Sequence, residues 1–311
     1  MGNYLVAGVT QIETIVRVKE VPVVYQPLTV AVDSIYTSVG GDAYNESMAL
    51  IALGNRVNFV SHVGKDQELG IFNPHHTDIM IPTKYIMKDL TETPASVILF
   101  DEQRNQQIFE DIKDLRHAKT DMNAMTPLME EADMVVLSNA NFCRPIAEEA
   151  SKLGKKVAAN IRCYDRKKEK YNSDFYNAAD ILYLSDDTIK TDPRDFIRSM
   201  SEKYDIDIVI MGQGKEGCVL YDRTSGINAH FNAVNAGQVV NTAGAGNALF
   251  SCFLHYYLES GDSTAAIKNA LLFASYKIGF MGTSEGFMSE AQMKEWRDKI
   301  WGVKDPFSEF K

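Results

Sequence analysis

A glycine-rich turn between Val239 and Phe250 carries the clearest chemical signal in the sequence. Its core, residues 243–246 (AGAG), follows an apolar pair and precedes large apolar residues that recur with the period of one helix face. Such a turn leaves backbone N–H groups free at the positive end of the helix dipole, which suits an oxyanion or a phosphate. Yet residues 241–253 contain no Asp, Glu, His or Lys that could take a proton from a nucleophile.

A second glycine turn contains Gly41 and is followed by Asp42 and Asn45, where a helical pattern begins. The carboxylate of Asp42 can accept hydrogen bonds from two hydroxyl groups, which favours a neutral polyol over a sugar phosphate. Taken alone, the segment is equally consistent with a tight turn in which Asn45 only caps the helix.

A third glycine cluster, Gly212, Gly214 and Gly217, matches the GxGxxG fingerprint of dinucleotide-binding proteins. Residues 218–221 (CVLY) then continue as a strand, whereas a dinucleotide-binding unit requires a helix at this place. We therefore interpret the cluster as a hairpin at the edge of a nucleotide pocket, with a dinucleotide-dependent enzyme as the less favoured alternative.

The elements that must position these turns alternate between short apolar runs and helical patterns, which indicates βα units around a largely parallel sheet. We expect strands at Tyr4–Val9, Val57–Val63, Met134–Ser138, Val157–Asn160, Ile181–Leu184 and Ile206–Met211. We expect helices at Asn45–Leu53, Arg144–Leu153, Arg194–Tyr204, Ala248–Glu259 and Thr264–Phe280, the last of them capped by Ser263.

Two regions, Thr14–Tyr36 and Ser96–Phe109, break this rhythm because Val, Ile, Tyr and Phe alternate there with turn residues. We interpret both as antiparallel strands that pair with each other in a small sheet projecting from the main body as a lid. No low-complexity linker or repeat divides the chain, so we expect one domain over residues 1–311 with an embedded lid.

Composition narrows the functional classes. The net charge is −10, and no run of Lys and Arg is long enough to argue otherwise, so nucleic acid is not an expected partner. No segment approaches 18 apolar residues, so no membrane partner is expected either. The four cysteines are far apart and lie in or beside apolar stretches, which predicts buried free thiols in a cytoplasmic protein.

Three segments together, GGDAYNESMALIALG, VGKDQELG and NTAGAGNALFSCFL, resemble the signatures of the ribokinase-like (PfkB) carbohydrate kinases. The order and spacing hold from Tyr4 to about Gly286. The resemblance implies a three-layer α/β/α core around a nine-stranded type of sheet, and a β lid formed by about residues 10–36 and 92–112. It also implies a sugar substrate under the lid and ATP with Mg²⁺ as the phosphoryl donor, and it admits a monovalent cation.

The resemblance assigns residues to each part of the site. Asn160-Ile161-Arg162 resembles the N-x-R of the fructokinase and ketodeoxygluconate-kinase branch, although Arg162 is also consistent with a solvated loop charge. The anion hole would be formed by Gly244, Ala245 and Gly246. The sugar would contact Gln11, Glu13, Gly41, Asp42, Asn45 and Arg162. The nucleotide would lie against Gly212, Gly214, Gly217, Thr242, Gly244, Gly246 and Ser275.

The departures from the family pattern concern the chemistry itself. The family's C-terminal motif begins and ends with Asp, and the second Asp is the general base; here the two positions are Asn241 and Asn247. An amide cannot usefully accept a proton at neutral pH, and a positioned base contributes about 10²–10⁴ in rate. The family's magnesium-organising N-x-x-E is replaced by residues 185–188 (SDDT).

Asp186 or Asp187 can still hold a metal through water, or they are exposed acids at the start of the next helix. Two hypotheses follow. The first is a PfkB sugar kinase acting on a sugar or sugar-acid hydroxyl, slow or impaired because Asn247 stands at the base position. The second is a non-catalytic relative that binds a sugar or nucleotide as a sensor or partner. Dimerisation through the lid is expected in either case because a projecting sheet exposes strand edges.

Overall fold

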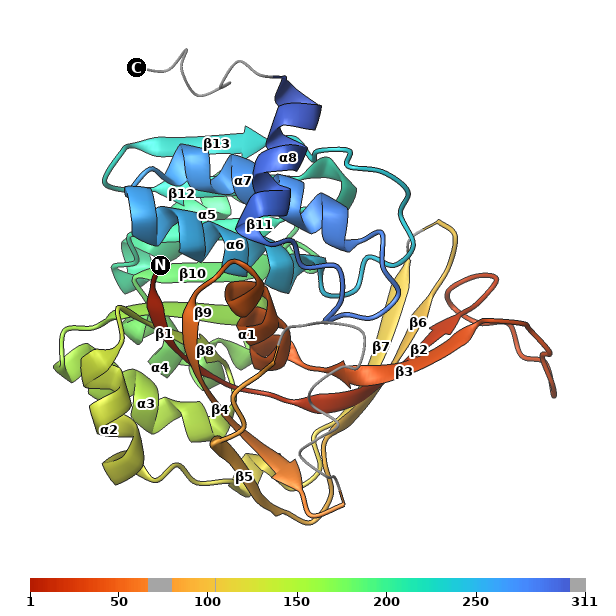
Figure 1. Cartoon of the computed structure of the whole chain (residues 1–311), viewed down its shortest axis with the longest axis horizontal. Helices are drawn as coiled ribbons and strands as arrows, with labels where there is room; N and C mark the ends of the chain where they lie inside the picture. The colour runs from red at the N-terminus through yellow and green to blue at the C-terminus, as the bar shows by residue number, and fades with distance from the viewer. Residues whose placement is uncertain (67–79, 104, 303–311) are drawn as a thin grey trace.

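The computed structural model describes residues 1–66, 80–103 and 105–302, and its largest element is a nine-stranded sheet (Figure 1). In their order across the sheet, the strands are β13 (Ile227–Phe231), β12 (Cys218–Asp222), β11 (Ile208–Gly212), β10 (Ile181–Ser185), β9 (Lys156–Cys163), β8 (Met134–Ser138), β1 (Asn3–Ala7), β4 (Arg56–Gly64) and β5 (Tyr85–Leu90).

The sheet is parallel from β5 to β11, and only β12 and β13 run antiparallel to their neighbours. Strand β1 is the third strand from the β5 edge, with Tyr4 opposite Val57 on one side and Met134 on the other. Strand β8 is buried along its whole length, as expected when helices cover both faces of a parallel sheet. The predicted strands are therefore confirmed to within a few residues.

Helices cover both faces of the sheet, which gives the expected three-layer α/β/α core. Because side chains alternate along a strand, Tyr4 and Val6 face one helical layer while Leu5 and Ala7 face the other. The first layer holds α1 (Asp42–Ala52), α6 (Ala245–Ser260), α7 (Ser263–Lys277) and α8 (Glu290–Trp301). The second holds α2 (Met122–Glu131), α3 (Arg144–Lys152), α4 (Glu169–Ala178) and α5 (Pro193–Tyr204).

A second, four-stranded sheet projects from the side of the core (Figure 1). Its order is β3 (Ile35–Gly40), β2 (Gln11–Arg17), β6 (Ala95–Phe100), β7 (Gln106–Asp111). The two regions that broke the βα rhythm do pair with each other, as predicted. The predicted antiparallel direction is wrong for the pairing between the two regions. Strands β2 and β6 run parallel, because each directly follows a strand of the parallel main sheet, β1 or β5. The antiparallel pairs are β2 with β3 and β6 with β7.

Three local predictions also need correction. The first helix begins at Asp42 rather than Asn45, because Gly41 takes φ 102° and its carbonyl accepts the first helical hydrogen bond, from Asn45. Asp262, not Ser263, caps α7, and the Ser263 hydroxyl instead donates to Asp222 over 2.6 Å. Cys163 is exposed at the end of β9, whereas the other three cysteines are buried free thiols.

Candidate active site

The glycine turn opens α6 with free donors, as the sequence predicts. Gly244 has φ 80°, and a Cβ there would lie 2.5 Å from the carbonyl oxygen of Thr283, so only glycine fits. Within the described residues, the backbone N–H groups of Gly244, Gly246 and Asn247 have no acceptor. These groups lie at the N-terminus of a 16-residue helix, where the dipole favours an anion.

Asn247, at the position where the base is expected, is fixed through both ends of its side-chain amide. Its Oδ1 accepts a hydrogen bond from Asn160 Nδ2 at 2.9 Å, and its Nδ2 donates to Asp42 Oδ1 at 3.4 Å. Asn160 Nδ2 also donates to Glu46 Oε1 at 2.7 Å. The four side chains come from α6, β9 and α1, so the predicted glycine turn and the predicted double-glycine helix meet here.

Arg162 pairs with carboxylates on both sides of the site. Its guanidinium lies 3.6 Å from Asp42 Oδ2 and 2.6 Å from Glu110 Oε1 on β7. The backbone of Arg162 is left-handed, with φ 64°, and its N–H donates to Asn160 Oδ1. Arg162 is therefore a two-thirds buried link between the core and the small sheet, rather than a solvated loop charge.

Burial dominates the electrostatics of this cluster. It raises the pKa of Asp42, although the Arg162 charge opposes the rise. It raises the pKa of Glu46 well above its usual value, and the nearby Asp42 charge adds to the rise. A carboxyl group with a raised pKa is a stronger proton acceptor once ionised, which is the property that a general base requires.

Gln11, Glu13, Gly41 and Asn45 gather beside this cluster. Glu13 Oε1 accepts hydrogen bonds from Gln11 Nε2 at 3.0 Å and from the Gly41 N–H at 3.1 Å. The hydroxyl of Thr283 donates to Glu13 Oε2 and lies 3.4 Å from Asn45 Oδ1. Burial raises the pKa of Glu13, while these donors act in the opposite direction. Glu13 therefore ties the small sheet to the double-glycine turn.

Several buried acceptors at this edge of the sheet lack a hydrogen-bond partner among the described residues: Thr10 Oγ1, Gln11 Oε1, Glu46 Oε2 and Ser138 Oγ. Thr10 follows β1 and Ser138 ends β8, while Gln11 begins β2 and Glu46 lies on α1. Because β1 and β8 are parallel neighbours, their carboxyl ends reach the same edge, which is where open α/β sheets bind ligands.

The third glycine cluster forms the predicted hairpin. Strand β11 ends at Gly212, a 3-10 turn covers Gly214–Glu216, and β12 returns antiparallel with Cys218 opposite Gly212. The dinucleotide alternative is wrong for this cluster, because a strand and not a helix follows it. Ser275, on α7, accepts a hydrogen bond from the Ala236 N–H at 2.9 Å and so positions the loop after β13.

Asp186 and Asp187 follow β10 beside this hairpin. Gln213 Nε2 donates to Asp186 Oδ2 at 3.2 Å, and the Ser185 hydroxyl donates to Asp187 Oδ2 at 2.6 Å. They are not N-terminal acids of the next helix, since α5 is capped by Asp192. In the described part of the chain, no three His, Cys, Asp or Glu side chains gather into a metal site. Two acids and a nucleotide's phosphates nevertheless suffice for Mg²⁺.

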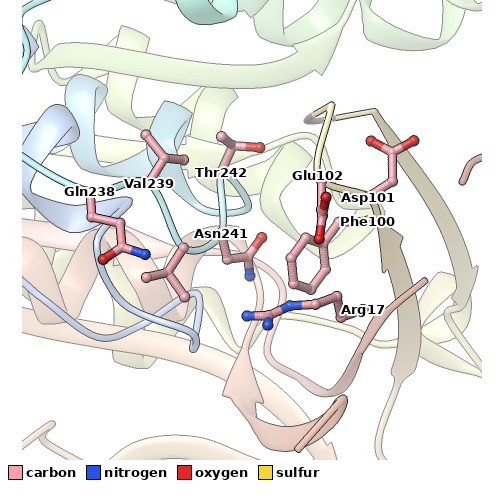
Figure 2. Close-up of a pocket in the computed structure, with 9 residues that line it drawn as sticks. Arg17, Phe100, Asp101, Glu102, Gln238, Val239, Asn241 and Thr242 are labelled. Atoms are coloured by element: carbon pink, nitrogen blue, oxygen red, sulfur yellow. The ribbon is translucent and has the colours of Figure 1, made fainter. Parts of the chain in front are cut away.

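A cavity of about 280 Å³ adjoins the glycine turn (Figure 2). It is lined by Arg17, Phe100, Asp101 and Glu102 of the small sheet and by residues 238–242 of the core. It shares Asn241 and Thr242 with the turn but none of the side chains around Asp42, so it is a separate space. The small sheet also contacts the turn directly, through a hydrogen bond from Gln106 to Thr242.

Comparison with known proteins identifies the family. The model of the pfkB family carbohydrate kinases matches residues 2–290. The chain belongs to the pfkB family. Of the segment VGKDQELG that contributed to the resemblance, residues 67–70 lie outside the described residues. Residues 1–66, 80–103 and 105–302 contain no helix with the length and apolar character needed to cross a membrane.

Similar proteins are kinases of this family. The chain is 36% identical to a deoxyribokinase of Salmonella typhi over 99 residues, which is 32% of this chain and 31% of that relative. A microbiome-derived acarbose kinase superposes with a TM-score of 0.81 at 22% identity, covering 95% and 98% of the two chains. Arabidopsis thaliana ribokinase complexed with ribose and ATP gives 0.73 at 16% identity, covering 95% and 98%.

Sequence reasoning missed Glu46, Glu110 and Thr283. Glu46 had a usable signal, because it lies four residues after Asp42 and so shares its helix face. Glu110 and Thr283 are 52 and 270 residues from their partners Arg162 and Glu13, and no local pattern marks such contacts.

Proposed function

We propose that this pfkB protein transfers the γ-phosphoryl group of ATP to a hydroxyl of a neutral sugar, with Asp42 as the proton acceptor. The observation that carries the proposal is the contact between Asn247 and Asp42. The carboxylate missing at position 247 is present 3.4 Å away on α1, held in place by the amide that replaced it. The site thus keeps one acid, Asp42, directly beside the amide at the base position.

The charges around Asp42 support a neutral substrate. The carboxyl groups of Glu13, Glu46 and Glu110 lie near that of Asp42, and Arg162 already pairs with Asp42 and Glu110. A sugar acid would meet repulsion here, whereas sugar hydroxyls can donate to the unpartnered acceptors at this edge of the sheet. Relatives named deoxyribokinase and ribokinase support the same substrate class.

The chemical step follows from these positions. The attacking hydroxyl loses its proton to Asp42 as its oxygen forms the bond to the γ-phosphorus. The bond between that phosphorus and the bridging oxygen breaks, and ADP leaves. Negative charge on the transferred group faces the free N–H groups of Gly244, Gly246 and Asn247, which stabilise it without moving.

The nucleotide is proposed to lie along the hairpin at Gly212, with its phosphates at the turn. Asp186 and Asp187 would hold Mg²⁺ through water at the end of β10, and the ion would neutralise phosphate charge during transfer. The small sheet is proposed to act as a lid within one domain, because Glu110 on β7 reaches Arg162 beside the sugar.

Turnover is proposed to be slow. Arg162 lowers the basicity of Asp42, and a base displaced from its usual place is less well aligned with the hydroxyl. Kinase activity is tested by ATP consumption across a panel of pentoses, hexoses, nucleosides and sugar acids. The proposal expects turnover with a neutral sugar and none with sugar acids. Absence of turnover with every compound would contradict it.

The alternative is a protein that binds sugar or nucleotide without turnover. One observation favours it: Arg162 lies 3.6 Å from Asp42 Oδ2, and its charge opposes the rise in the pKa of Asp42, which makes this carboxylate a weaker base. Under the alternative, Asp42 only accepts hydrogen bonds from the sugar. Calorimetry would then show sugar and ATP binding in a mixture in which no ADP forms.

A further inference from the structure

Lys277, the last residue of α7, is fully buried beside the glycine turn. Its exposed fraction is 0%, and its ammonium group donates a hydrogen bond to the carbonyl oxygen of Ala243, the first residue of the AGAG turn. A buried ammonium is expensive unless its surroundings compensate for the lost water. The groups around the Lys277 ammonium must therefore offset this cost.

Two carboxylates partly compensate for the burial of the Lys277 ammonium, although neither contacts it directly. Glu13 on β2 and Glu285 in the loop after α7 both act electrostatically on Lys277, but within the described residues neither forms an ion pair with it. Glu285 is occupied by the Tyr36 hydroxyl and the Gly282 N–H, and Glu13 by Gln11, Gly41 and Thr283. Much of the ammonium charge is therefore left to act on the turn itself.

Asn241 forms hydrogen bonds with the backbone groups next to Lys277. Its Oδ1 accepts a hydrogen bond from the Ala243 N–H at 3.0 Å, and its Nδ2 donates to the carbonyl of Met281 at 2.7 Å. Its backbone N–H donates to the carbonyl of Ile278 at 3.1 Å. An aspartate at 241 could not make the bond to Met281, because a carboxylate has no hydrogen to donate.

These contacts do not fit the monovalent cation that the family resemblance admits. Protein sites for such cations are built from carbonyl oxygens that replace the ion's water. Here the Ala243 carbonyl is taken by the Lys277 ammonium, the Met281 carbonyl by the Asn241 amide, and the Ile278 carbonyl by two backbone N–H groups. The carboxylate that would balance a bound cation is also absent at position 241.

We propose that Lys277 is a built-in cation that replaces a bound monovalent ion beneath the anion turn. Its ammonium fixes the Ala243 carbonyl and supplies the positive charge that draws the phosphates of a nucleotide to the turn. The asparagine at position 241 is part of the same arrangement, because its amide donates a hydrogen bond to the Met281 carbonyl, which a bound cation would otherwise need. The inference rests on the proposed function only in assigning nucleotide phosphates to this turn, and it does not require turnover.

The first test uses the unmodified chain. Its melting temperature and its affinity for ATP are measured in chloride salts of potassium, sodium and N-methylglucamine at equal ionic strength. The proposal predicts the same melting temperature and the same affinity, within about twofold, in all three salts. A saturable increase of either quantity with potassium would overturn it, because it would show a cation site that the lysine does not fill.

The second test removes the ammonium. Lys277→Ala leaves a void and Lys277→Met fills it without charge; both should weaken ATP binding by about tenfold or more, as expected for a lost charge-assisted contact. Potassium or ammonium ions should restore ATP binding to Lys277→Ala but not to Lys277→Met. Lys294→Ala, at an exposed position on α8, is the control and should change neither.

Undiminished ATP affinity in Lys277→Met would overturn the proposal, and so would an Ala variant that folds but gains nothing from any cation. Should the Ala variant fail to fold, the Met variant and the salt comparison on the unmodified chain still decide. Failure of the proposed function is distinguishable: ADP would not form, while the ATP-binding pattern would remain.

Discussion

The side-chain amide of Asn247 donates to the carboxylate of Asp42 across 3.4 Å, although 205 residues separate the two in sequence. An aspartate at 247 would place two carboxylates at this distance and raise the pKa of one of them. The amide instead holds Asp42 beside Arg162, where it can be ionised. The two positions are thus chemically coupled, and the loss of the usual base cannot be judged from position 247 alone.

Glu46 is expected to weaken the fold as pH rises, because burial raises its pKa in the folded state. Its pKa is raised in the folded state, so its contribution is fully present below the unfolded pKa of about 4.3 and is lost as pH rises above that value. Glu46→Gln keeps an acceptor for Asn160 and removes the titration. The variant should therefore gain in free energy of unfolding, relative to the unmodified chain, as pH rises above about 4.3.

Urea unfolding at several pH values measures this difference. Glu148→Gln is the matched control, since Glu148 is exposed and, among the described residues, forms an ion pair only with Lys152 on the same helix. If the difference between Glu46→Gln and the unmodified chain does not change with pH, folding does not raise the pKa of Glu46.

The link between Arg162 and Glu110 is predicted to hold the small sheet over the sugar. Glu110→Gln removes the charge from one end of a contact of 2.6 Å, and a charged hydrogen bond contributes about 1.5–3 kcal/mol. The variant should raise KM for the sugar by about 10- to 100-fold while changing kcat little. Hydrogen exchange should become faster in β6 and β7 and stay unchanged in β8. Equal exchange in both proteins would rule out this role.

Lys277 gives two opposite pH dependences. Burial lowers its pKa to about 8 against the raising effect of Glu13 and Glu285, so the ammonium is charged below that pH and neutral above it. ATP affinity should fall as pH rises through about 8. The free energy of unfolding should instead rise between about pH 8 and 10.4, because the unfolded chain binds more protons than the folded chain in this range.

Lys277→Met is expected to abolish both dependences. Fluorescence titration with ATP measures the first dependence, and urea unfolding measures the second. Both are carried out from about pH 6.5 to about pH 9.5 in steps of about half a unit. Persistence of the alkaline loss of ATP affinity in the Met variant would assign it to another group.

Dimerisation through the small sheet remains a prediction, with a second copy of this chain as the expected partner. Strand β7 is an edge strand, and Val97, Ile108 and Phe109 are exposed by 38%, 44% and 54%. Exposed edges with apolar side chains favour association. Light scattering after size exclusion should give twice the chain mass of 34.8 kDa, and Phe109→Glu should give a monomer. A monomeric unmodified chain at micromolar concentration would contradict this prediction.

Local sequence patterns were enough to predict the core. Buried strands such as β8 read as continuous apolar runs, and glycines marked the turns that begin α1 and α6. The direction of the β2–β6 pairing was missed because it depends on where two strands leave the main sheet, about 80 residues apart, and not on their own residues.

The site was predicted in part. The glycine motifs located Asp42, Asn45 and Asn247, but no local pattern reveals that Asn247 faces Asp42 or that Lys277 reaches the Ala243 carbonyl. Lys277 stands at the end of an ordinary helical pattern, where a basic residue is usually explained by the helix dipole. Only the packing of α7 against the turn shows that its ammonium is buried.

The proposed role of Asp42 is tested most directly by exchanging the acid and the amide. We would measure kcat for the unmodified chain, for Asp42→Asn and for the double variant Asp42→Asn with Asn247→Asp, on the best neutral sugar. Asp42→Asn should lose about 10²–10⁴ in kcat, and the double variant should regain most of it. Asp195→Asn, exposed on α5, is the control. Full activity in Asp42→Asn would contradict the account.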